Sequence, residues 1–430
     1  MTNTTLSDSD FFLIRGGGRL KGAVRVSGSK NASLPIMMAT LLTEKPCVIR
    51  NVPTLLDVKN VIELLEILGA DVKFENHTVC VETKNIRSYF APDYVVRRMR
   101  ASILVAGPLL ARLGRAVVGM PGGCSIGARS IDQHLKVFEK GGTTINVKGG
   151  YIHMEVENIR PVEHTFEVIT VTGTENALMF LSRCEKRSVL RNVALEPEVM
   201  DLVEVLRKLG VEIEVEGRTM IIKGSKDLRG FDHTVIPDRI EAGTLAVAGF
   251  ITGGDIVLEG VCPKHMGNQL EKLKEAGAKI ELLGLDRIRV IGDGKINPLE
   301  ISTSEYPGFP TDMQAQFMVL CCIADGISQI TENIFENRFQ HVNELQRMGA
   351  NIKLKGRTTI VFGQKKLSGA EVFSTDLRAS ASLVLAGLVA EGTTVVREIH
   401  HLDRGYERLE EKLKSLGACI ERVVHAKSIR

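Results

Sequence analysis

One pattern of apolar residues occurs six times along the chain. In each copy, a segment with helical apolar spacing ends at a glycine and is followed by strand-like alternation. A glycine just past the last turn is the usual left-handed end of a helix. Repeats of this length exceed those of open solenoids, so we expect them to close into globular domains. The glycines, roughly 70 residues apart, are Gly69, Gly141, Gly210, Gly277, Gly349 and Gly417.

A second, more apolar helix and further strands complete the repeat. In the first copy the strands are expected at Cys47–Arg50, Asp71–Glu75 and Thr78–Glu82. One unit therefore reads β-α-β-α-β-β. The more apolar helices are expected at Asn31–Leu42, Ala101–Leu113, Glu175–Leu181, Glu241–Ile251, Met313–Ala324 and Ala379–Ala390.

The sixth unit lacks its last pair of strands, and a matching pair occurs at the other end of the chain. Residues 12–24 resemble residues 360–371. A chain of 430 residues also exceeds what one hydrophobic core usually supports. We therefore expect an α/β protein of two domains with three units each. Residues 1–29 and 238–430 would form a discontinuous domain built from both termini, and residues 30–237 an inserted domain.

Composition excludes several classes of function. A net charge of +3 and the absence of tryptophan argue against a nucleic-acid-binding protein. The apolar runs are far shorter than a membrane span and the N-terminus has no signal-peptide pattern, which predicts a cytoplasmic protein without membrane insertion. The cysteines have no zinc-binding spacing. Neither a P-loop nor a dinucleotide-binding glycine motif is present, so any phosphate would be bound by arginines and helix ends.

The loop Gly119-Met-Pro-Gly-Gly-Cys124-Ser-Ile-Gly-Ala-Arg129 combines a thiol, flexible glycines and a cation. Glycines allow the backbone to turn sharply and approach a ligand closely. A thiol in such a setting is more often reactive than structural, and the Arg129 guanidinium suits a phosphate or a carboxylate. We expect an anionic group to meet Cys124 here.

Aligning the repeats places charged residues at two recurrent junctions, one before each class of helix. Both junctions should lie at helix N-termini, where backbone N–H groups and the helix dipole favour anions. The basic residues at these junctions would complete pockets for a multiply anionic substrate. They are Lys30, Arg100, Arg129, Arg338, Arg378 and Arg404.

Each of these residues also has a purely structural interpretation. Asp238, Asp312 and Asp376 could simply be helix N-caps, which aspartate favours. The arginines could be solvated or salt-bridged on the surface. His134 has no convincing catalytic partner in the sequence, which favours a surface or packing role. Cys321-Cys322 lies in an apolar helix and is expected in the core.

Seven ordered motifs resemble one family over essentially the full length of the chain. They are Gly28-Ser-Lys30-Asn31-Ala, Met99-Arg100-Ala-Ser, Pro121-Gly-Gly-Cys124-Ser-Ile-Gly-Ala-Arg129, Phe309-Pro-Thr-Asp312-Met-Gln-Ala-Gln, Phe335-Glu-Asn-Arg338-Phe, Asp376-Leu-Arg378-Ala-Ser and Asp403-Arg404-Gly-Tyr-Glu-Arg. The chain is similar to the UDP-N-acetylglucosamine enolpyruvyltransferases (1-carboxyvinyltransferases) of the enolpyruvyltransferase family. The resemblance implies two inside-out α/β-barrel domains, each of three β-α-β-α-β-β units.

The resemblance also implies an activity. Enzymes of this family transfer enolpyruvate from phosphoenolpyruvate to the 3-hydroxyl of UDP-N-acetylglucosamine and release phosphate, beginning peptidoglycan synthesis. By likeness, Cys124 would be the proton donor or transient nucleophile and a target of fosfomycin, and Asp312 the base at the sugar hydroxyl. Lys30 and Arg404 would complete the catalytic set. This chemistry requires no metal or organic cofactor.

The same resemblance assigns binding residues. The phosphoenolpyruvate set is Lys30, Asn31, Arg129, Arg338, Arg378 and Arg404. The nucleotide-sugar set is Asn31, Arg100, Arg129, Ser130, Ile131, Asp132, Gln133, Thr170, Val171, Thr172, Asp312 and Ile334. The chain departs from some members of the family around Thr170–Thr172, where they carry a Ser-Val-Gly-Ala-Thr type of sequence.

Two alternatives remain open from the sequence. The related shikimate 3-phosphate enolpyruvyltransferases share the fold and phosphoenolpyruvate but lack the cysteine loop. A non-catalytic nucleotide-sugar sensor would not need Lys30, Cys124, Asp312 and Arg404 together.

Overall fold

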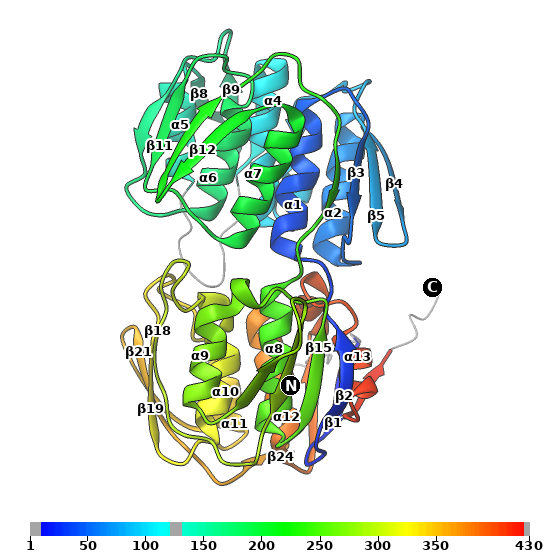
Figure 1. The fold of residues 1–430 in the computed structure, drawn as a ribbon, viewed down its shortest axis with the longest axis vertical. Coiled ribbons are helices and arrows are strands. Elements are labelled where there is room, and N and C mark those ends of the chain that lie inside the picture. Colours follow the sequence, from blue (N-terminus) through cyan, green and yellow to red (C-terminus); the bar gives the residue numbers. More distant parts are fainter. Residues whose placement is uncertain (1–9, 121–130, 425–430) are drawn as a thin grey trace, which may run out of the picture. The chain divides into compact units, whose positions relative to one another are not determined.

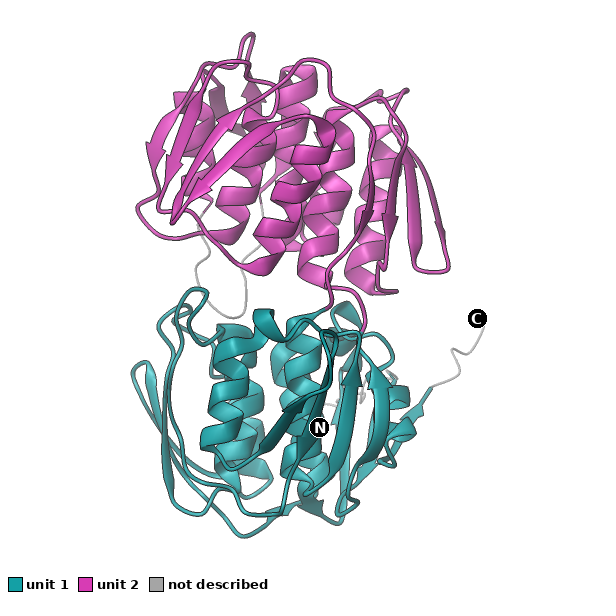
Figure 2. Cartoon of the chain, in the orientation of Figure 1, with its two compact units in different colours: residues 1–26, 125–127, 238–430 teal, residues 27–124, 128–237 magenta. Residues whose placement is uncertain are grey.

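The computed structural model describes residues 10–120 and 131–424, and these divide into two compact units. Unit 1 contains described residues 10–26 and 238–424, and unit 2 contains 27–120 and 131–237 (Figure 2). The first and last parts of the described chain thus share a unit. The division into a terminal domain of residues 1–29 and 238–430 and an inserted domain of residues 30–237 stays a prediction.

Unit 2 contains three four-stranded sheets with the same strand arrangement. Each has a parallel pair at one edge, followed by two antiparallel pairings. In spatial order the strands are β14 (Asp232–Thr234), β3 (Cys47–Arg50), β5 (Thr78–Glu82) and β4 (Asp71–Glu75); β6 (Phe90–Ala91), β7 (Arg115–Gly119), β9 (Tyr151–Glu155) and β8 (Thr144–Lys148); and β10 (Glu163–Thr165), β11 (Ser188–Arg191), β13 (Thr219–Lys223) and β12 (Glu212–Glu216).

Unit 1 repeats the same design three times, with an additional short pair, β22 (Leu367–Ser368) and β24 (Ala390–Glu391). Its four-stranded sheets have the same parallel edge pair and antiparallel remainder. They are β2 (Lys21–Arg25), β15 (Asp255–Glu259), β17 (Arg287–Ile291) and β16 (Lys279–Leu282); β18 (Glu300–Ser302), β19 (Ile327–Thr331), β21 (Thr358–Phe362) and β20 (Asn351–Lys355); and β23 (Glu371–Phe373), β25 (Thr393–Arg397), β1 (Phe11–Arg15) and β26 (Cys419–Val423).

The strand that leads into a repeat does not always pair within that repeat. Strand β2 precedes the first helix of unit 2 but pairs in parallel with β15 of unit 1. Strand β14 precedes the first central helix of unit 1 but pairs with β3 of unit 2. Strand β1 pairs with both β25 and β26, so the start and end of the described chain close one sheet. At these two points, where the chain passes between the units, the strand before a helix pairs in a sheet of the other unit.

Helices fill the centre of each unit and the sheets lie around them (Figure 1). The central helices are buried almost all round, as expected of helices that are apolar on every side. In unit 2 the helices are α1 (Lys30–Ala39), α2 (Leu56–Leu68), α3 (Asp93–Val96), α4 (Ala106–Leu113), α5 (Asp132–Lys140), α6 (Val171–Leu181) and α7 (Pro197–Leu209). In unit 1 they are α8 (Arg239–Ile251), α9 (Gly267–Glu275), α10 (Gln314–Cys322), α11 (His341–Arg347), α12 (Leu377–Val389) and α13 (Leu409–Ser415).

The helix ends differ from the sequence prediction in two respects. Gly141 does not adopt the left-handed conformation (φ −73°), and the next residue, Gly142, does so instead (φ 97°). Two of the more apolar helices also begin as 3-10 turns, at Arg100–Val105 and Thr311–Met313. The other five repeat glycines have positive φ, as predicted.

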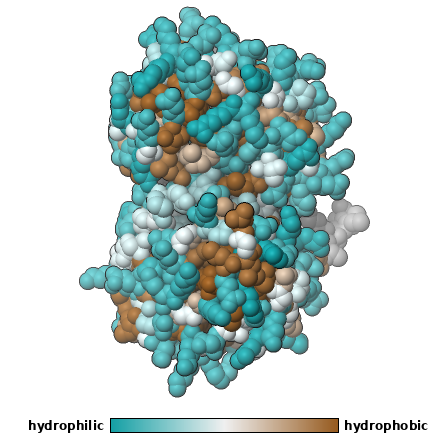
Figure 3. Space-filling model, in the orientation of Figure 1, coloured by the Kyte–Doolittle hydropathy of each residue, from teal (hydrophilic) through white to brown (hydrophobic). Residues whose placement is uncertain are grey.

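Each unit has its own hydrophobic core. Cys321 and Cys322 lie fully buried in the core of unit 1, as predicted, and burial raises the pKa of the Cys321 thiol to about 12. On the face drawn in Figure 3, hydrophilic side chains cover most of the surface and the apolar areas form separate patches. Within the described residues, no helix combines the length and apolar character that a membrane span requires.

Candidate active site

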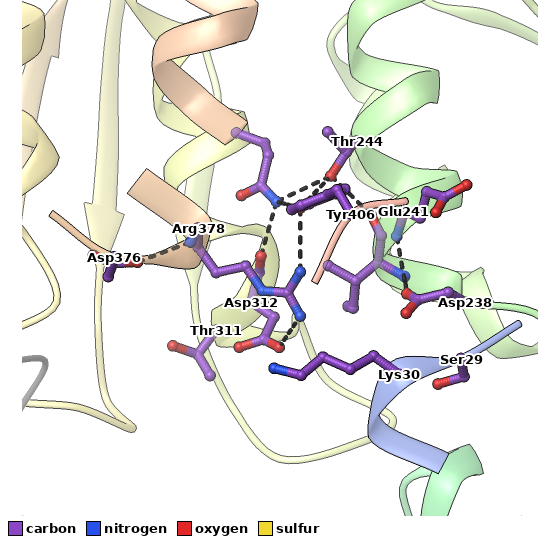
Figure 4. A network of polar contacts seen from close by, with 12 residues as sticks. Ser29, Lys30, Asp238, Glu241, Thr244, Thr311, Asp312, Asp376, Arg378 and Tyr406 are labelled. Atoms are coloured by element: carbon purple, nitrogen blue, oxygen red, sulfur yellow. Dashed lines mark hydrogen bonds and ion pairs between the residues drawn. The ribbon is translucent and has the colours of Figure 1, made fainter. Parts of the chain in front are cut away.

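The carboxylate of Asp312 in unit 1 is held by two buried arginines. Arg378 Nη2 donates to Asp312 Oδ2 at 2.6 Å, and Arg338 Nη2 lies 2.8 Å from Asp312 Oδ1. The arginine side chains are only 5% and 8% exposed. Figure 4 shows Arg378 and Asp312 directed toward one another. Charge-assisted pairs of this length are the strongest class of hydrogen bond in proteins.

Local structure explains how these side chains meet. Asp312 lies in the 3-10 turn that leads into α10, and its side chain caps neither that turn nor α10. Arg378 is the second residue of α12, whose N-cap, Asp376, accepts hydrogen bonds from the N–H groups of Arg378 and Ala379. Because α10 packs against α12, the two helix starts bring residues 66 positions apart into contact.

The electrostatics of this cluster favour an ionised Asp312. Burial by itself raises the pKa of a carboxyl group, but the charges of Arg378 and Arg338 outweigh it and hold the pKa of Asp312 well below its usual range. Asp312 in turn raises the pKa of Arg378, against the lowering effect of burial. In this arrangement Asp312 is a weak base.

Further polar side chains fix the two guanidinium groups. Arg338 Nη1 donates to Thr311 Oγ1 at 2.9 Å, and that hydroxyl donates to Glu332 at 2.9 Å. Arg378 Nη1 donates to the hydroxyl of Tyr406 at 3.2 Å. The hydroxyl of Thr244 lies 2.9 Å from that of Tyr406 and itself donates to a backbone carbonyl. The arginines are therefore preorganised to bind a carboxylate.

Glu332 and Arg404 lie in two connecting segments of unit 1, and of the two only Arg404 was singled out from the sequence. Glu332 is fully buried and accepts from the N–H of Ile334, at 2.9 Å, and of Phe335. Arg404 ends a 3-10 turn, and the preceding Asp403 is bound by both Nη atoms of Arg422 at 2.6 and 3.0 Å. Hydrogen bonds thus fix the backbone that follows Glu332 and the side chain of the residue that precedes Arg404.

Lys30 in unit 2 is paired with a buried carboxylate. It is the first residue of α1, and its Nζ lies 2.8 Å from Asp57 Oδ2 on α2. The Lys30 side chain is 11% exposed and Asp57 only 1%. Asn31 follows in the same turn and is half-buried. A lysine held in this way presents its charge at the start of a helix, where the backbone also favours anions.

Several residues of the predicted nucleotide-sugar set lie close together in unit 2. Gln133, on the first turn of α5, donates to Asp132 and accepts from the N–H of Glu167. Thr170 caps α6, which begins with Val171 and Thr172. His134 joins the two helix starts, with its Nε2 3.3 Å from Thr172 Oγ1. Ile131 precedes α5, and Arg100 lies near enough to His134 for its charge to lower the pKa of that imidazole.

The Cys124 loop falls largely outside the described residues, and Cys124, Arg129 and Ser130 all lie outside them. The remaining predicted site residues are described. In the two described ranges, no group of three or more His, Cys, Asp or Glu side chains is arranged to hold a metal ion.

Comparisons with known proteins place this geometry in a family. A family described as EPSP synthase (3-phosphoshikimate 1-carboxyvinyltransferase) matches residues 14–413. A UDP-N-acetylglucosamine 1-carboxyvinyltransferase of Koribacter versatilis is 50% identical over 419 residues, covering 96% of each chain. One of Desulfosudis oleivorans is 50% identical over 415 residues, covering 96% of this chain and 99% of the relative. The chain belongs to the carboxyvinyltransferase family.

Solved carboxyvinyltransferase structures agree with the fold. The enolpyruvyl transferase NikO from Streptomyces tendae matches with a TM-score of 0.88 at 26% identity, covering 98% of this chain and 100% of that one. An EPSP synthase from Acinetobacter baumannii matches with a TM-score of 0.75 at 19% identity, covering 96% and 100%. The predicted fold of two inside-out α/β barrels and the predicted family are both confirmed.

The interpretation of three aspartates as helix N-caps holds for two of them. Asp238 and Asp376 are helix N-caps, each accepting from two backbone N–H groups. Asp312 is not a cap, because its carboxylate is bound by arginines. Glu175, expected at a helix start, instead lies inside α6 and is fully buried.

Sequence reasoning missed several residues that contact this carboxyvinyltransferase's candidate site. Asp57, Glu332 and Asn176 were not singled out, and Tyr406 was quoted only as part of a motif. His134, expected to have a surface or packing role, is buried and also contacts Thr172 and Asn176. Their signal in the sequence was weak, because each gains its role from a partner far along the chain.

Proposed function

We propose that this chain transfers the enolpyruvyl group of phosphoenolpyruvate to the 3-hydroxyl of UDP-N-acetylglucosamine and releases phosphate. The relatives that are 50% identical over nearly the full length bear the name of this activity. The observation that carries the proposal is the arginine pair, which binds a carboxylate, that of Asp312, at 2.6 and 2.8 Å. Phosphoenolpyruvate offers such a carboxylate beside its phosphate.

The proposed reaction is an addition followed by an elimination. The sugar oxygen attacks C2 of the enol phosphate while a proton is delivered to its methylene carbon, and a base removes the hydroxyl proton. Loss of phosphate and of one methyl proton then restores the double bond. Cationic charge develops at C2, so the surrounding cations must hold the two anionic groups without repelling that centre.

Residue roles in this proposal follow the family likeness. Cys124 supplies the proton, and Lys30, Arg129 and Arg404 bind the phosphate. Arg338 and Arg378 bind the carboxylate. Residues proposed for the nucleotide sugar are Asn31, Arg100, Arg129, Ser130, Ile131, Asp132, Gln133, Thr170, Val171, Thr172, Asp312 and Ile334.

The pairing of Asp312 suggests how it becomes a base. Arg378 and Arg338 suppress its basicity while they bind it. A substrate carboxylate that takes over these guanidinium donors releases Asp312 and moves a negative charge beside it, and both changes raise the pKa of the aspartate. In this proposal, arrival of phosphoenolpyruvate turns a structural ion pair into a base at the sugar hydroxyl.

The proposal extends to the role in the cell. An enzyme that uses these substrates begins peptidoglycan synthesis, which serves cell-wall formation, cell shape and division. We infer a cytoplasmic location, because the proposed substrates are phosphorylated and water-soluble.

A phosphate-release assay tests the function. Phosphoenolpyruvate with UDP-N-acetylglucosamine should release inorganic phosphate, and mass spectrometry should find the sugar nucleotide heavier by one enolpyruvyl group. The same assay with shikimate 3-phosphate is the comparison, because the matching family carries that description. Release with shikimate 3-phosphate alone would refute the proposal, and binding of the nucleotide sugar without turnover would indicate a sensor.

A further inference from the structure

A chain of hydrogen bonds in unit 2 runs from the interior to the start of α6. The N–H of Gly107 donates to Asn176 Oδ1 at 2.7 Å, and Asn176 Nδ2 donates to the carbonyl of Ile103 at 2.9 Å. The same amide nitrogen lies 3.0 Å from His134 Nδ1, and His134 Nε2 lies 3.3 Å from Thr172 Oγ1. Asn176 and His134 are 0% and 2% exposed.

The partners at the inner end fix the direction of every bond in this chain. A backbone N–H can only donate and a carbonyl can only accept, so the amide of Asn176 has one orientation. Its second N–H then donates to His134 Nδ1, which must be an acceptor. A neutral imidazole with an acceptor at Nδ1 carries its proton at Nε2, and this N–H donates to Thr172 Oγ1.

The imidazole is held in that neutral form. Burial, together with the positive charge of Arg100, lowers the pKa of His134 to about 3, although Asp132 acts in the opposite sense. The fixed close approach of α4 to α6 supports the arrangement, because a Cβ on Gly107 would lie 2.5 Å from Asn176 Oδ1. Direction and protonation state are therefore both set by the fold.

Thr172 is the outer end of the chain. Its oxygen accepts from His134, so its own proton is available to a further acceptor. Among the described residues, none accepts that proton. By contrast, the nearby hydroxyl of Thr174 donates to the carbonyl of Thr170 and accepts from the N–H of Ala194. Thr172, which is half-buried, thus differs from Thr174 in having a donor left for a ligand.

We propose that His134 is a positioning residue that holds the Thr172 hydroxyl as a hydrogen-bond donor to an acceptor oxygen of the nucleotide sugar. The inference rests on the proposed function, which supplies the ligand. The acceptor is a carbonyl of the uracil ring or an oxygen of the diphosphate. In either case the site favours an acceptor at this point and disfavours a ligand that presents an N–H there.

Calorimetric binding of UDP-N-acetylglucosamine to the full chain tests the inference. We expect Thr172→Val to weaken binding about tenfold, because the ligand oxygen loses its partner. Thr172→Ser keeps the hydroxyl and should bind within about threefold of the unchanged protein. Thr144→Val, which removes an exposed hydroxyl from β8 of the same unit, is the matched control and should bind normally.

A double-mutant cycle separates positioning from general structural support. His134→Phe should weaken binding about threefold to tenfold, and Thr172→Val combined with His134→Phe should bind no more weakly than Thr172→Val alone. In turnover, KM for the nucleotide sugar should rise while kcat and KM for phosphoenolpyruvate stay unchanged. His134→Gln, whose amide can again donate to Thr172, should recover part of the loss.

Each outcome decides a separate claim. Binding of Thr172→Val within twofold of the unchanged protein, or additive losses in the cycle, would overturn the inference while leaving the function intact. Failure of the unchanged protein to bind UDP-N-acetylglucosamine would instead refute the proposed function. Uridine, uridine monophosphate and UDP distinguish the acceptor: a Thr172→Val effect already present with uridine assigns it to the base, and one that appears only with UDP assigns it to the diphosphate.

Discussion

The starts of α10 and α6 occupy the same place in the repeat but carry opposite kinds of chemistry. At α10, Asp312 is an ionised carboxylate between two guanidinium groups. At α6, Thr172 ends a chain of neutral groups whose direction is fixed by the backbone. The repeat thus determines where polar groups gather. The side chains then determine the chemistry: the start of α10 can exchange one anion for another, and the start of α6 offers a hydrogen-bond donor of fixed direction.

The two junctions also differ in whether a nearby charge compensates the buried group. Burial lowers the pKa of Arg378, but the charge of Asp312 at the start of α10 outweighs that effect and the guanidinium stays charged. The imidazole near α6 loses its charge because no sufficient anion faces it. Replacing the only partner of a buried charge destabilises the protein. A neutral buried network is instead destabilised by low pH, which favours protonation of its histidine.

Removing the Asp312 carboxylate should have the largest effect. We expect Asp312→Asn to lower kcat about a thousandfold, since general-base catalysis contributes 10²–10⁴-fold. Its Kd for phosphoenolpyruvate should fall, because no internal carboxylate then competes for Arg338 and Arg378. Phosphate release and calorimetry give the two values.

Asp376→Asn is the control for that experiment, because Asp376 caps α12 in the adjacent repeat and asparagine caps equally well. Its turnover should be close to normal. Circular dichroism confirms that the Asp312→Asn protein is folded. Two outcomes with a folded Asp312→Asn protein would contradict this contrast between the junctions. Turnover within tenfold of normal would exclude Asp312 as the base, and weaker phosphoenolpyruvate binding would exclude its competition for the arginines.

Acidification should distinguish the neutral junction from the charged one. An unfolded chain binds a proton at His134 below its ordinary pKa of about 6.5, whereas the folded chain resists protonation down to about pH 3. The free energy of unfolding should therefore fall as the pH drops through this interval, by about 1.4 kcal/mol per pH unit from this residue.

Urea unfolding at several pH values, followed by hydrogen exchange of α6, measures the pH effect. His134→Gln should flatten the slope, because glutamine does not titrate. His341 in unit 1, with a pKa lowered by burial to about 4, should continue to contribute in both proteins. Identical slopes with and without His134 would contradict the buried neutral imidazole.

Tyr406→Phe should have the smallest effect of the three. It removes the acceptor for Arg378 Nη1 and the partner of Thr244 while keeping the ring under the guanidinium. We expect a loss of about 1–2 kcal/mol in stability and a few-fold rise in KM for phosphoenolpyruvate, with KM for the nucleotide sugar unchanged. Tyr89→Phe, at an exposed tyrosine, is the control. An equal rise in both KM values would mean that Tyr406 does not act through Arg378.

The sequence predicted the fold well because its signals are local. Apolar periodicity and terminal glycines mark elements within a few residues, and an aspartate at a helix start is a good indicator of a cap, as at Asp238 and Asp376. The expected bounds, 1–29 and 30–237, put β2 with the terminal residues and β14 with the inserted ones, but the sheet partners of these two strands were not predicted. Each strand is as compatible with one sheet as with another by pattern alone, and only long-range pairing decides between them.

The site was predictable as a set of residues but not as a set of partners. Family motifs indicated Lys30, Asp312 and Arg378, yet the pairing of Lys30 with Asp57 and of Asp312 with both arginines depends on how helices pack. The capping propensity of aspartate argued for the wrong role at Asp312. A buried histidine such as His134 carries no sequence signal of its hydrogen-bond direction, which comes from Asn176.

The late partners of the first two strands have a consequence for biosynthesis. Strand β1 pairs antiparallel with β25 and β26, and β2 pairs in parallel with β15. These first strands leave the ribosome before any of their partners exist. At the usual rate of chain elongation, β2 waits roughly 10–50 s for β15, and β1 waits longer. All strands of unit 2 are synthesised in that interval, so the chain of the inserted unit is complete before β2 meets its partner. We therefore expect chaperones that bind extended chains to remain longest on β1 and β2.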